Sequence, residues 1–328
     1  MDSEVMIVLS AYNGARFIRE QIESIRAQTF RDWTLLIRDD GSSDDTVPII
    51  RELANHDARI SLLGDSSGNV GAWRSFGLLL SAARQDGAKY VFFSDQDDVW
   101  LQQKMSTQLN ALRAVEKSSP STPVLVHSDL LVVDDRLSPI HPSFREFQHA
   151  AYEASDPLGT LLVHNTVVGC TIAINQPLME LADPLPPDAP HDWWLSLCAA
   201  SAGRIVSLEE PMVQYRQHSS NAIGAQARRA SRMRLARTPL RTVIAVFKGI
   251  AESVSLATAL EQRLMERNAT ATVARARVRQ YRAAFATLSP ILRLRALKKS
   301  GARPTRRLSR ALFPAIVALM PRYANGSR

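Results

Sequence analysis

Residues 90–98 have the sequence YVFFSDQDD, in which an apolar run ends in three carboxylates within four positions. An uninterrupted apolar run predicts a strand buried on both faces, as in a parallel sheet. Residues 5–13 (VMIVLSAYN) and 34–41 (TLLIRDDG) repeat this form, with polar side chains directly after an apolar strand. Loops at the carboxyl ends of parallel strands line the ligand crevice of open α/β sheets, so we expect these three loops to form one site.

Helical patterns separate these strands. Apolar residues recur at helical spacing over residues 17–25, 47–53, 71–83 and 101–115. A short strand is expected at 60–63, and Asp98 could cap the last helix if that helix begins at residue 99 or 100. Strands and helices that alternate at this spacing predict an α/β fold, with a mostly parallel sheet and helices on both of its faces.

Beyond residue 115 the alternation weakens. Strands are expected at 124–127, 130–133, 166–174, 204–208 and 212–215, a long loop at 139–157 and a helix at 191–201. His127 and Asp129 are interpreted as local hydrogen-bonding groups. Cys170 has no basic neighbour in the sequence that would activate a thiolate, so we expect Cys170 and Cys198 in the core.

Composition limits the class of protein. The chain has 328 residues, of which 45% are hydrophobic and 22% charged, as expected for one or two globular domains. Wholesale disorder, collagen-like repeats and a polytopic membrane protein are excluded. Two cysteines also exclude a disulfide framework and a cysteine-rich zinc site, and they suit a reducing compartment.

The charge is divided unevenly along the chain. Residues 1–224 carry 17 Lys/Arg against 29 Asp/Glu, a balance of −12, whereas residues 225–328 carry 23 against 3, a balance of +20; together they give the net +8. We therefore predict a domain over 1–224 and a basic helical C-terminal region over 225–328. No signal peptide is expected, and the apolar run 311–320 is shorter than the ~20 residues of a membrane span, so a soluble or surface-attached protein is expected.

Carboxylates gathered at strand ends repel one another unless a cation or donors satisfy them. A divalent cation that prefers oxygen ligands is the natural partner, so the cluster at Asp95, Asp97 and Asp98 predicts Mg²⁺ or Mn²⁺ holding a diphosphate. The alternative is a solvated turn whose acids cap the next helix. The motif alone leaves both interpretations open.

The full set of motifs resembles the inverting glycosyltransferases of family 2, which have the GT-A fold, a Rossmann-like mixed sheet. The motifs are SAYN (10–13), QTF (28–30), RDDGSSDDT (38–46), NVG (69–71), SDQDDVW (94–100), NTVVGC (165–170), HDWW (191–194) and YRQH (215–218). The similarity covers about residues 4–221 and is greatest to bacterial rhamnosyltransferases of O-antigen and surface-polysaccharide assembly. It implies transfer of a sugar, L-rhamnose from dTDP-rhamnose, to a hydroxyl of a lipid-linked glycan.

The resemblance also implies a donor site. The residues expected to bind the nucleotide sugar are Ser10, Ala11, Tyr12, Asp40, Asn69, Arg74 and Asp95. Tyr12 would stack on the base and Asp40 would accept the base's ring N–H. Taken singly, Tyr12 could be a packed strand-end aromatic, Asp40 a turn acid and Arg74 a solvated helix arginine.

For the metal and the chemistry, the resemblance implies Asp97 and His218 as ligands and Asp192 as the base. A single inverting displacement needs a carboxylate that takes the acceptor hydroxyl's proton, and the rings of Trp193 and Trp194 would raise the pKa of such a base. The alternatives are a surface histidine and an N-cap aspartate. Many relatives have Glu where this chain has His191, so the role of that position stays open.

The basic tail predicts an anionic membrane surface as a partner, which suits a lipid-linked acceptor and a location on the cytoplasmic face of the inner membrane. Nucleic acid is not expected, because no recognition motif accompanies the few aromatic residues. A solvated helical bundle or an oligomerisation arm is the plainer alternative. Two other functions stay open: a Mg²⁺-dependent nucleotidyltransferase, and a non-catalytic protein that binds membrane or nucleic acid through the tail.

Overall fold

The computed structural model describes residues 3–148, 154–218, 239–267, 271–305 and 313–318, with the side chains of 239–246 left aside. These residues form two compact units. The first contains the described residues up to Phe144 together with 167–195 and 203–218. The second contains the described parts of 145–166, residues 196–202 and the described residues from 239 onward. The predicted domain boundary after residue 224 lies outside the described residues.

A mixed sheet forms the centre of the first unit, in the order β3-β2-β1-β4-β8-β6-β9-β5, with β7 paired to β6. The strands are β1 Val5–Ala11, β2 Thr34–Asp39, β3 Ile60–Leu62, β4 Tyr90–Ser94, β5 Val99–Trp100, β6 Val124–Val133, β7 Pro139–His141, β8 Ala173–Asn175 and β9 Arg204–Arg216. β1 pairs in parallel with both β2 and β4, with Leu9 opposite Ser94 and Ser10 opposite Arg38. This register brings the three polar strand ends to one edge.

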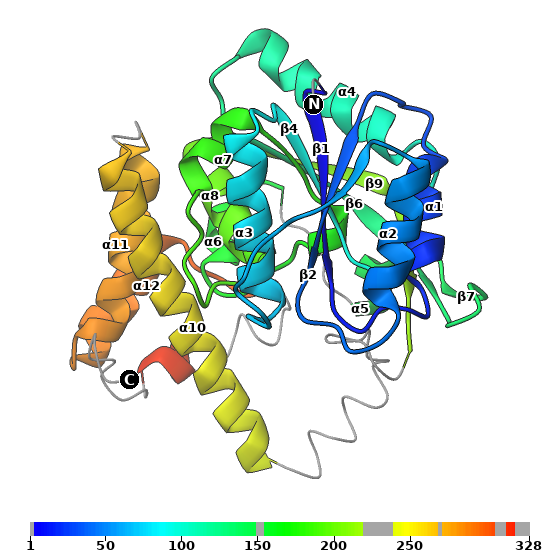
Figure 1. Cartoon of the computed structure of the whole chain (residues 1–328). Helices are drawn as coiled ribbons and strands as arrows, with labels where there is room; N and C mark the ends of the chain where they lie inside the picture. Colours follow the sequence, from blue (N-terminus) through cyan, green and yellow to red (C-terminus); the bar gives the residue numbers. More distant parts are fainter. Residues whose placement is uncertain (1–2, 149–153, 219–238, 268–270, 306–312, 319–328) are drawn as a thin grey trace. The chain divides into compact units, whose positions relative to one another are not determined.

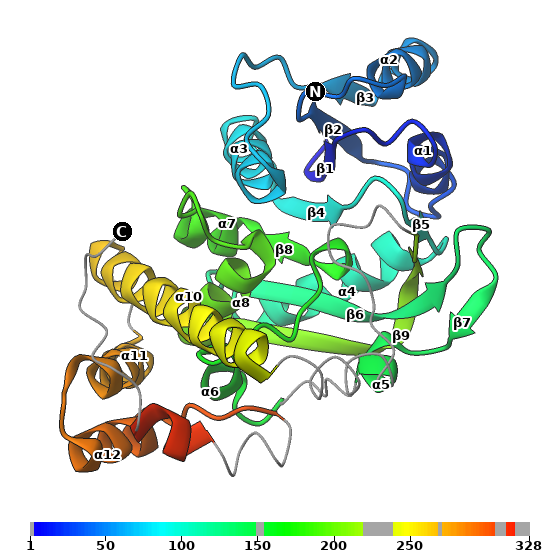
Figure 2. The ribbon, with the colours of Figure 1, turned by 90° about the horizontal axis from the view of Figure 1, so that it is seen from below.

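Helices cover both faces of this sheet, which confirms the predicted α/β class. Their bounds are α1 Ile18–Arg26, α2 Thr46–His56, α3 Ala72–Gln85, α4 Lys104–Ser118 and α7 Gln176–Ala182. α8 His191–Ala202 begins in the first unit and its residues 196–202 belong to the second, as do all residues of α5 Phe144–Gln148 except Phe144. α3 and α7 lie on one face, and α1 and α4 lie on the other (Figure 2). α1 buries Ile18, Ile22 and Ile25 fully, because these residues recur at helical spacing and face the sheet.

The segment after β4 differs from the prediction. Residues 99–100 form β5, which pairs antiparallel with β9, and α4 begins only at Lys104. The proposal that Asp98 caps a helix is therefore wrong. Asp98 is fully buried and its Oδ1 accepts the backbone N–H of Arg216 at 3.1 Å. Asp98 therefore stabilises the end of β9 and does not cap a helix.

Further differences concern strand lengths. β6 and β9 are each continuous where two strands were expected, because irregular pairing at residues 127–131 lets the two strands continue side by side. Only the end of 166–174 is a strand, since Gly169–Thr171 forms a 3₁₀ turn. The expected loop 139–157 contains β7 and α5. Both cysteines are buried, as predicted.

The second unit is helical and includes α6 Pro157–Leu161, α10 Pro239–Glu266, α11 Thr272–Ala286 and α12 Pro290–Ser300 (Figure 1). Val254 and Leu260 of α10 are buried, as are Val278 and Tyr281 of α11. The Tyr281 hydroxyl hydrogen-bonds the Ser253 hydroxyl at 2.8 Å, which satisfies both buried groups. Among the helices described, none has the length and apolarity needed to cross a bilayer.

Candidate functional site

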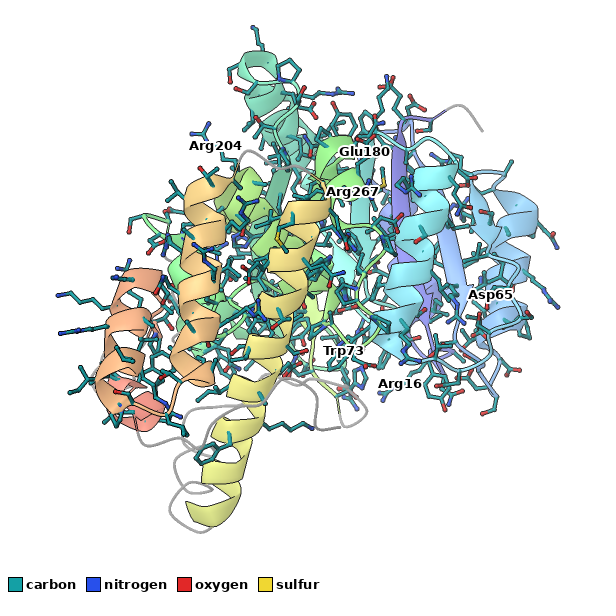
Figure 3. The ribbon with its side chains drawn as sticks, turned by 90° about the vertical axis from the view of Figure 1, so that its left-hand side faces the viewer. Arg16, Asp65, Trp73, Glu180, Arg204 and Arg267 are labelled. Atoms are coloured by element: carbon teal, nitrogen blue, oxygen red, sulfur yellow. The ribbon has the colours of Figure 1, made fainter. Side chains whose placement is uncertain are left out.

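The polar loops after β1, β2 and β4 meet at the edge where these parallel strands end, the lower edge in Figure 1. Arg16 and Trp73, from the loop after β1 and the first turn of α3, lie at this edge, whereas Arg204 at the start of β9 lies at the opposite edge (Figure 3). The predicted residues that follow these strands, among them Tyr12, Asp40 and Asp97, therefore lie at one edge of the sheet.

The loop after β1 is held by the loop after β4. The Gln96 side chain accepts the backbone N–H of Tyr12 at 2.8 Å and donates to its carbonyl at 2.9 Å. A side chain at Gly14 would collide with the Gln96 Oε1 atom, so glycine is required for this contact. The Tyr12 side chain is left 50% exposed, which makes its ring available for stacking on a flat ligand.

The loop after β2 is organised by a buried arginine. The Arg38 guanidinium donates to Asp40 Oδ1 at 2.6 Å and to Asp65 Oδ2 at 2.7 Å. Asp40 also accepts the backbone N–H groups of Val70 and Gly71, both at 2.8 Å. A carboxylate has about four acceptor positions, so one position on Asp40 Oδ2 is left for a ligand N–H. Asp40 is only 3% exposed, so a ligand would reach it from a narrow direction.

The other residues predicted to bind the donor differ in what they offer. The Ser10 hydroxyl bonds the Ser75 hydroxyl at 2.7 Å, and Asn69 is exposed. Ala11 buries its methyl group and its carbonyl accepts the N–H of Asp40 at 2.7 Å, so it positions Asp40 and presents no exposed side chain. Arg74 donates to Asp188 at 3.0 Å in an exposed pair, and such pairs contribute little to stability.

The predicted metal ligands are neighbours. His218 Nε2 lies 2.9 Å from Asp97 Oδ2, although the two residues are 121 positions apart in the sequence. Adjacent ligand atoms of an octahedral ion bonded at 2.0–2.1 Å lie about 3 Å apart, so this pair fits a divalent cation. The His218 ring also packs against Phe17 at a tilt of 34°, with centroids 4.7 Å apart, which restricts the ring's direction.

Arg216 is fully buried beside this pair and holds the loop after β4. Its Nε donates to the Asp97 carbonyl at 2.7 Å, and its Nη2 forms an ion pair with Glu20 at 2.5 Å. The guanidinium lies over the Phe17 ring, 4.6 Å from the centroid. Because one side chain joins α1, the loop after β4 and the end of β9, it fixes the backbone that carries Asp97.

A second set of potential ligands lies behind the loop. Ligand atoms of Asp95, Asp98 and Cys170 lie within 4.8 Å of one another. Burial raises the pKa of Cys170 well above its usual range, so the thiol stays protonated and suits a hard cation poorly. Burial, with Asp97 and Asp95 nearby, also raises the pKa of Asp98 well above its usual range and favours its neutral form. Asp97 and His218 are therefore the contacting pair that offers ligands suited to Mg²⁺ or Mn²⁺, and Asp95 interacts electrostatically with Asp97.

Asp95 interacts electrostatically both with Asp97, in the loop after β4, and with Asp192 of α8. Burial raises the pKa of Asp95 to about 7, and the like charges of Asp97 and then Asp192 add to the increase. Asp192, in the first turn of α8, is therefore close enough to interact electrostatically with Asp95. Asp95, Asp97 and Asp192 thus concentrate negative charge in this region, which a divalent cation would relieve.

A buried lysine accompanies these acids. Lys104 is fully buried, donates to Gln108 Oε1 at 2.5 Å and lies 4.3 Å from the centroid of the Trp100 ring. Burial lowers the pKa of Lys104 to about 7, while Cys170 and Asp98 partly oppose the decrease. Near neutral pH Lys104 is therefore only partly charged, and its side chain does not reach the exposed edge.

His191 precedes Asp192 and is neutral. Burial lowers the pKa of His191 to about 3, and its ring packs on Phe76 with centroids 4.1 Å apart. A Cβ atom at Gly169 would lie 2.6 Å from His191 Nε2, so the absence of a side chain there makes room for the imidazole. The Asp192 carboxylate accepts the N–H of Trp193 at 2.7 Å and is half-buried.

Sequence reasoning missed Gln96, Arg216, Lys104 and Trp73. The first two act through partners 84 and up to 196 positions away, so no local pattern identifies them. Trp73 is 41% exposed in the first turn of α3, and a tryptophan at an exposed helix start beside Arg74 was a usable signal.

Parts of this chain are similar in sequence to known proteins. Residues 6–168 match the family described as glycosyl transferase family 2. The dTDP-rhamnosyl transferase RfbG of Shigella flexneri is 26% identical over 221 residues, which cover 66% of this chain and 74% of RfbG. The UDP-Glc:alpha-D-GlcNAc-diphosphoundecaprenol beta-1,3-glucosyltransferase WfgD of Escherichia coli is 32% identical over 111 residues, 34% of this chain and 42% of WfgD.

Two solved structures share the fold. TarS of S. aureus superposes with a TM-score of 0.52 at 17% identity, over 86% of this chain and 42% of the TarS chain. The mannosyltransferase PcManGT from Pyrobaculum calidifontis, in complex with GDP-Man and Mn²⁺, superposes with a TM-score of 0.50 at 14% identity, over 92% of this chain and 86% of that one. The mixed sheet and its helices therefore form the GT-A fold expected from the motifs.

Proposed function

Since the chain belongs to glycosyltransferase family 2, we propose that it transfers L-rhamnose from dTDP-rhamnose to a hydroxyl of a lipid-linked glycan, with inversion at the anomeric carbon. The observation that supports this proposal is the contact between Asp97 and His218, together with the electrostatic interaction of Asp95 with Asp97 and Asp192. Asp97 and His218 suit the cation and diphosphate of a donor, and Asp192 suits an acceptor hydroxyl.

On the donor side, Tyr12 stacks on the base and the remaining acceptor position of Asp40 takes the base's ring N–H. The exposed ring of Tyr12 and the saturation of the other Asp40 positions support this assignment. Arg74 exchanges its exposed partner Asp188 for a donor phosphate, at little cost because the pair is solvated. Ser10 and Asn69 line the same edge.

A divalent cation, Mg²⁺ or Mn²⁺, would be held by Asp97, His218 and Asp95. When bound, it stabilises the negative charge that develops on the departing nucleoside diphosphate. The mannosyltransferase with this fold is described as a complex with GDP-Man and Mn²⁺, so the fold accommodates a donor together with such an ion. Arg216 keeps the Asp97 backbone in place, and Phe17 keeps the His218 ring in place.

Asp192 acts as the base. It accepts the proton of the acceptor hydroxyl while the hydroxyl oxygen attacks the anomeric carbon from the face opposite the diphosphate, which inverts the configuration. His191 is neutral and buried, so it adds no charge that would compete with Asp192 for the proton. The half-buried position of Asp192 in the first turn of α8 supports this role.

The relatives' names support the choice of substrates and also show what must be tested. RfbG is named for a dTDP-rhamnosyl donor, and WfgD for a UDP-Glc donor and a diphosphoundecaprenol-linked acceptor. We propose the rhamnosyl donor from the first name and a lipid-linked acceptor from the second. A lipid-linked acceptor and the basic C-terminal region together support action at an anionic membrane surface, on the cytoplasmic face of the inner membrane.

The test is release of the nucleoside diphosphate from dTDP-rhamnose and from UDP-glucose, with Mn²⁺ and with a diphosphoundecaprenol-linked sugar as acceptor. Asp192→Asn should lower turnover by about 10²–10⁴-fold, the usual contribution of a general base, and should leave donor binding unchanged. Asp86→Asn is the matched control, because Asp86 is exposed at the far end of α3.

Turnover that falls equally in both variants, or in neither, would contradict the role of Asp192. Release only from UDP-glucose would overturn the rhamnosyl donor and retain the transferase. Consumption of a nucleoside triphosphate with release of pyrophosphate would point to a nucleotidyltransferase.

A further inference from the structure

α12 has an inverted pattern of exposure. It buries Arg293, which is 2% exposed, and presents aliphatic side chains to solvent. Leu288 is 72% exposed, Ile291 66%, Leu292 51% and Leu294 39%. These four exposed aliphatic residues fall within seven positions, a concentration that soluble proteins rarely leave without a partner.

The local structure is ordered around this surface. The Arg293 guanidinium donates to the Thr287 carbonyl at 2.7 Å and to the Val317 carbonyl at 3.1 Å, so its inward direction is determined by specific bonds. The Ser289 hydroxyl accepts the N–H of Leu292 and caps α12, and Gly301 ends the helix with a φ of +70°. Ile291, Leu292 and Leu294 therefore lie on a helix that is capped at both ends, and Leu288 directly precedes the N-terminal cap.

The second half of the same exposed face is basic. Arg295, Lys298 and Lys299 are exposed, and their side chains have no hydrogen-bond or ion-pair partner in the described part of the chain. No Asp or Glu follows Glu266 in the sequence. α11 and α12 lie side by side (Figures 1 and 2), and Lys299 lines an open hollow of about 450 Å³ with Thr272 and Val273 of α11. Val273 is itself 75% exposed.

We propose that this face of the α11–α12 hairpin, the aliphatic–basic face, docks on an anionic lipid bilayer. Its residues are Val273, Leu288, Ile291, Leu292, Leu294, Arg295, Lys298 and Lys299. α12 lies along the interface, with its aliphatic side chains among the acyl chains and its basic side chains on lipid phosphates. The inference rests on the proposed action at a membrane and identifies the surface that makes contact.

The aliphatic–basic face carries both basic and apolar side chains, and this combination favours a bilayer over other anionic partners. Nucleic acid would satisfy Arg295, Lys298 and Lys299 through its phosphates, but it would leave the aliphatic half of the face in water. An apolar protein groove would cover the aliphatic half and leave the basic half unmatched. Only an anionic interface places both kinds of group in a favourable environment on one continuous face.

The test is co-sedimentation of the full chain with phosphatidylcholine vesicles that contain or lack phosphatidylglycerol. Ile291→Glu with Leu292→Glu should lower the affinity for phosphatidylglycerol vesicles at least about tenfold, since both side chains leave the apolar layer. Ile140→Glu is the matched control, because Ile140 is 49% exposed on β7 of the first unit. The substituted residues are exposed, so the variants should keep the wild-type melting temperature.

A second set of variants tests the basic half. Replacing Arg295, Lys298 and Lys299 by Gln should lower the affinity for anionic vesicles by about fivefold for each charge removed. The control replaces Arg51, Lys117 and Arg136 by Gln, three exposed cations of the first unit, and it should change the affinity little.

Absence of binding to phosphatidylglycerol vesicles, or binding that neither set weakens, would overturn the proposal. Tighter binding to duplex DNA than to vesicles, lost with the charges but kept in the aliphatic variant, would overturn it in favour of nucleic acid. The metal-dependent binding of dTDP is measured on the same variants. Donor binding that fails while vesicle binding behaves as expected would refute the transferase proposal alone, and the converse would refute the docking face alone.

Discussion

Asp95 shows most clearly how single residues shape this site. Its pKa is raised to about 7 because it is buried and because Asp97 and Asp192 bring like charges close to it. The folded state therefore holds a proton on Asp95 that the unfolded state has released above its ordinary pKa near 4. Stability from this group is lost as the pH rises from about 4 towards 7, and a bound cation would restore it.

Replacing Asp95 by Asn should therefore stabilise the metal-free protein above pH 7 and have little effect near pH 4. Each kcal/mol of relieved repulsion corresponds to about 2–4 °C in melting temperature. The measurement is thermal unfolding in chelator across this pH range, repeated with Mn²⁺. Because Asn is a weaker ligand, Mn²⁺ should stabilise the wild type more than the variant. A variant that is less stable than the wild type in chelator above pH 7 would contradict the claim that repulsion among Asp95, Asp97 and Asp192 destabilises the metal-free protein.

Arg216 should control metal affinity without touching the metal. In Arg216→Gln the Asp97 carbonyl and Glu20 lose their shared partner, so the loop after β4 should loosen. We expect Mn²⁺ affinity to fall by about 10–100-fold, as is usual when a group that orients a ligand is removed. The measurement is calorimetric titration with Mn²⁺ in the presence of dTDP.

The control for this experiment is Arg204→Gln, an exposed arginine at the other end of the same strand. Arg216→Lys should recover little of the affinity, since a lysine cannot donate in several directions from one plane. Equal Mn²⁺ affinity in the Arg216→Gln and Arg204→Gln variants would show that Arg216 only supports the fold.

At the scale of elements, the loops after β1 and β4 behave as one unit through Gln96. In Gly14→Ala the added methyl group displaces the Gln96 side chain and breaks both of its bonds to the Tyr12 backbone. Since the displaced atom ends a flexible side chain, we expect a loss of only about 1–2 kcal/mol in stability, together with weaker dTDP binding.

A double-mutant cycle with Gln96→Ala isolates this contact. Once Gln96 is shortened, Gly14→Ala should have almost no further effect on dTDP binding, because the collision no longer exists. The measurement is dTDP affinity for the four proteins of the cycle. Additive losses would mean that Gly14 acts through something other than Gln96.

Strand-end loops could be predicted from sequence because apolar runs, turns and carboxylates are local. β5 could not be predicted in this way. Its two residues, Val99 and Trp100, form a strand only because Gln214 and Val213 of β9 lie opposite them. The same long-range pairing leaves Asp98 buried and bonded to Arg216, where a local interpretation favoured a helix cap.

At the scale of the whole molecule, the order of the motifs was enough to predict the fold. It also predicted that the acids after the strands lie at one edge of the sheet. What it could not supply were the side chains that hold those acids, since Arg216 contacts Glu20 across 196 positions. The division of charge along the chain predicted a distinct basic region. The burial of Arg293 in α12 depends on its bonds to the carbonyls of Thr287 and Val317, which no helical spacing indicates. The exposure of the aliphatic residues on the opposite face follows from it.

The central claim is that the carboxyl edge of the sheet binds a nucleoside diphosphate through a cation at Asp97. It is tested most directly by thermal unfolding with dTDP, UDP, GDP, ADP or CDP, each with and without Mn²⁺, on the wild type and on Asp97→Ala. A ligand at a hundredfold excess over its dissociation constant adds roughly 2.7 kcal/mol of stability. We predict an increase with dTDP that requires Mn²⁺ and disappears in Asp97→Ala. Folded protein that no diphosphate stabilises, with or without Mn²⁺, would contradict the account.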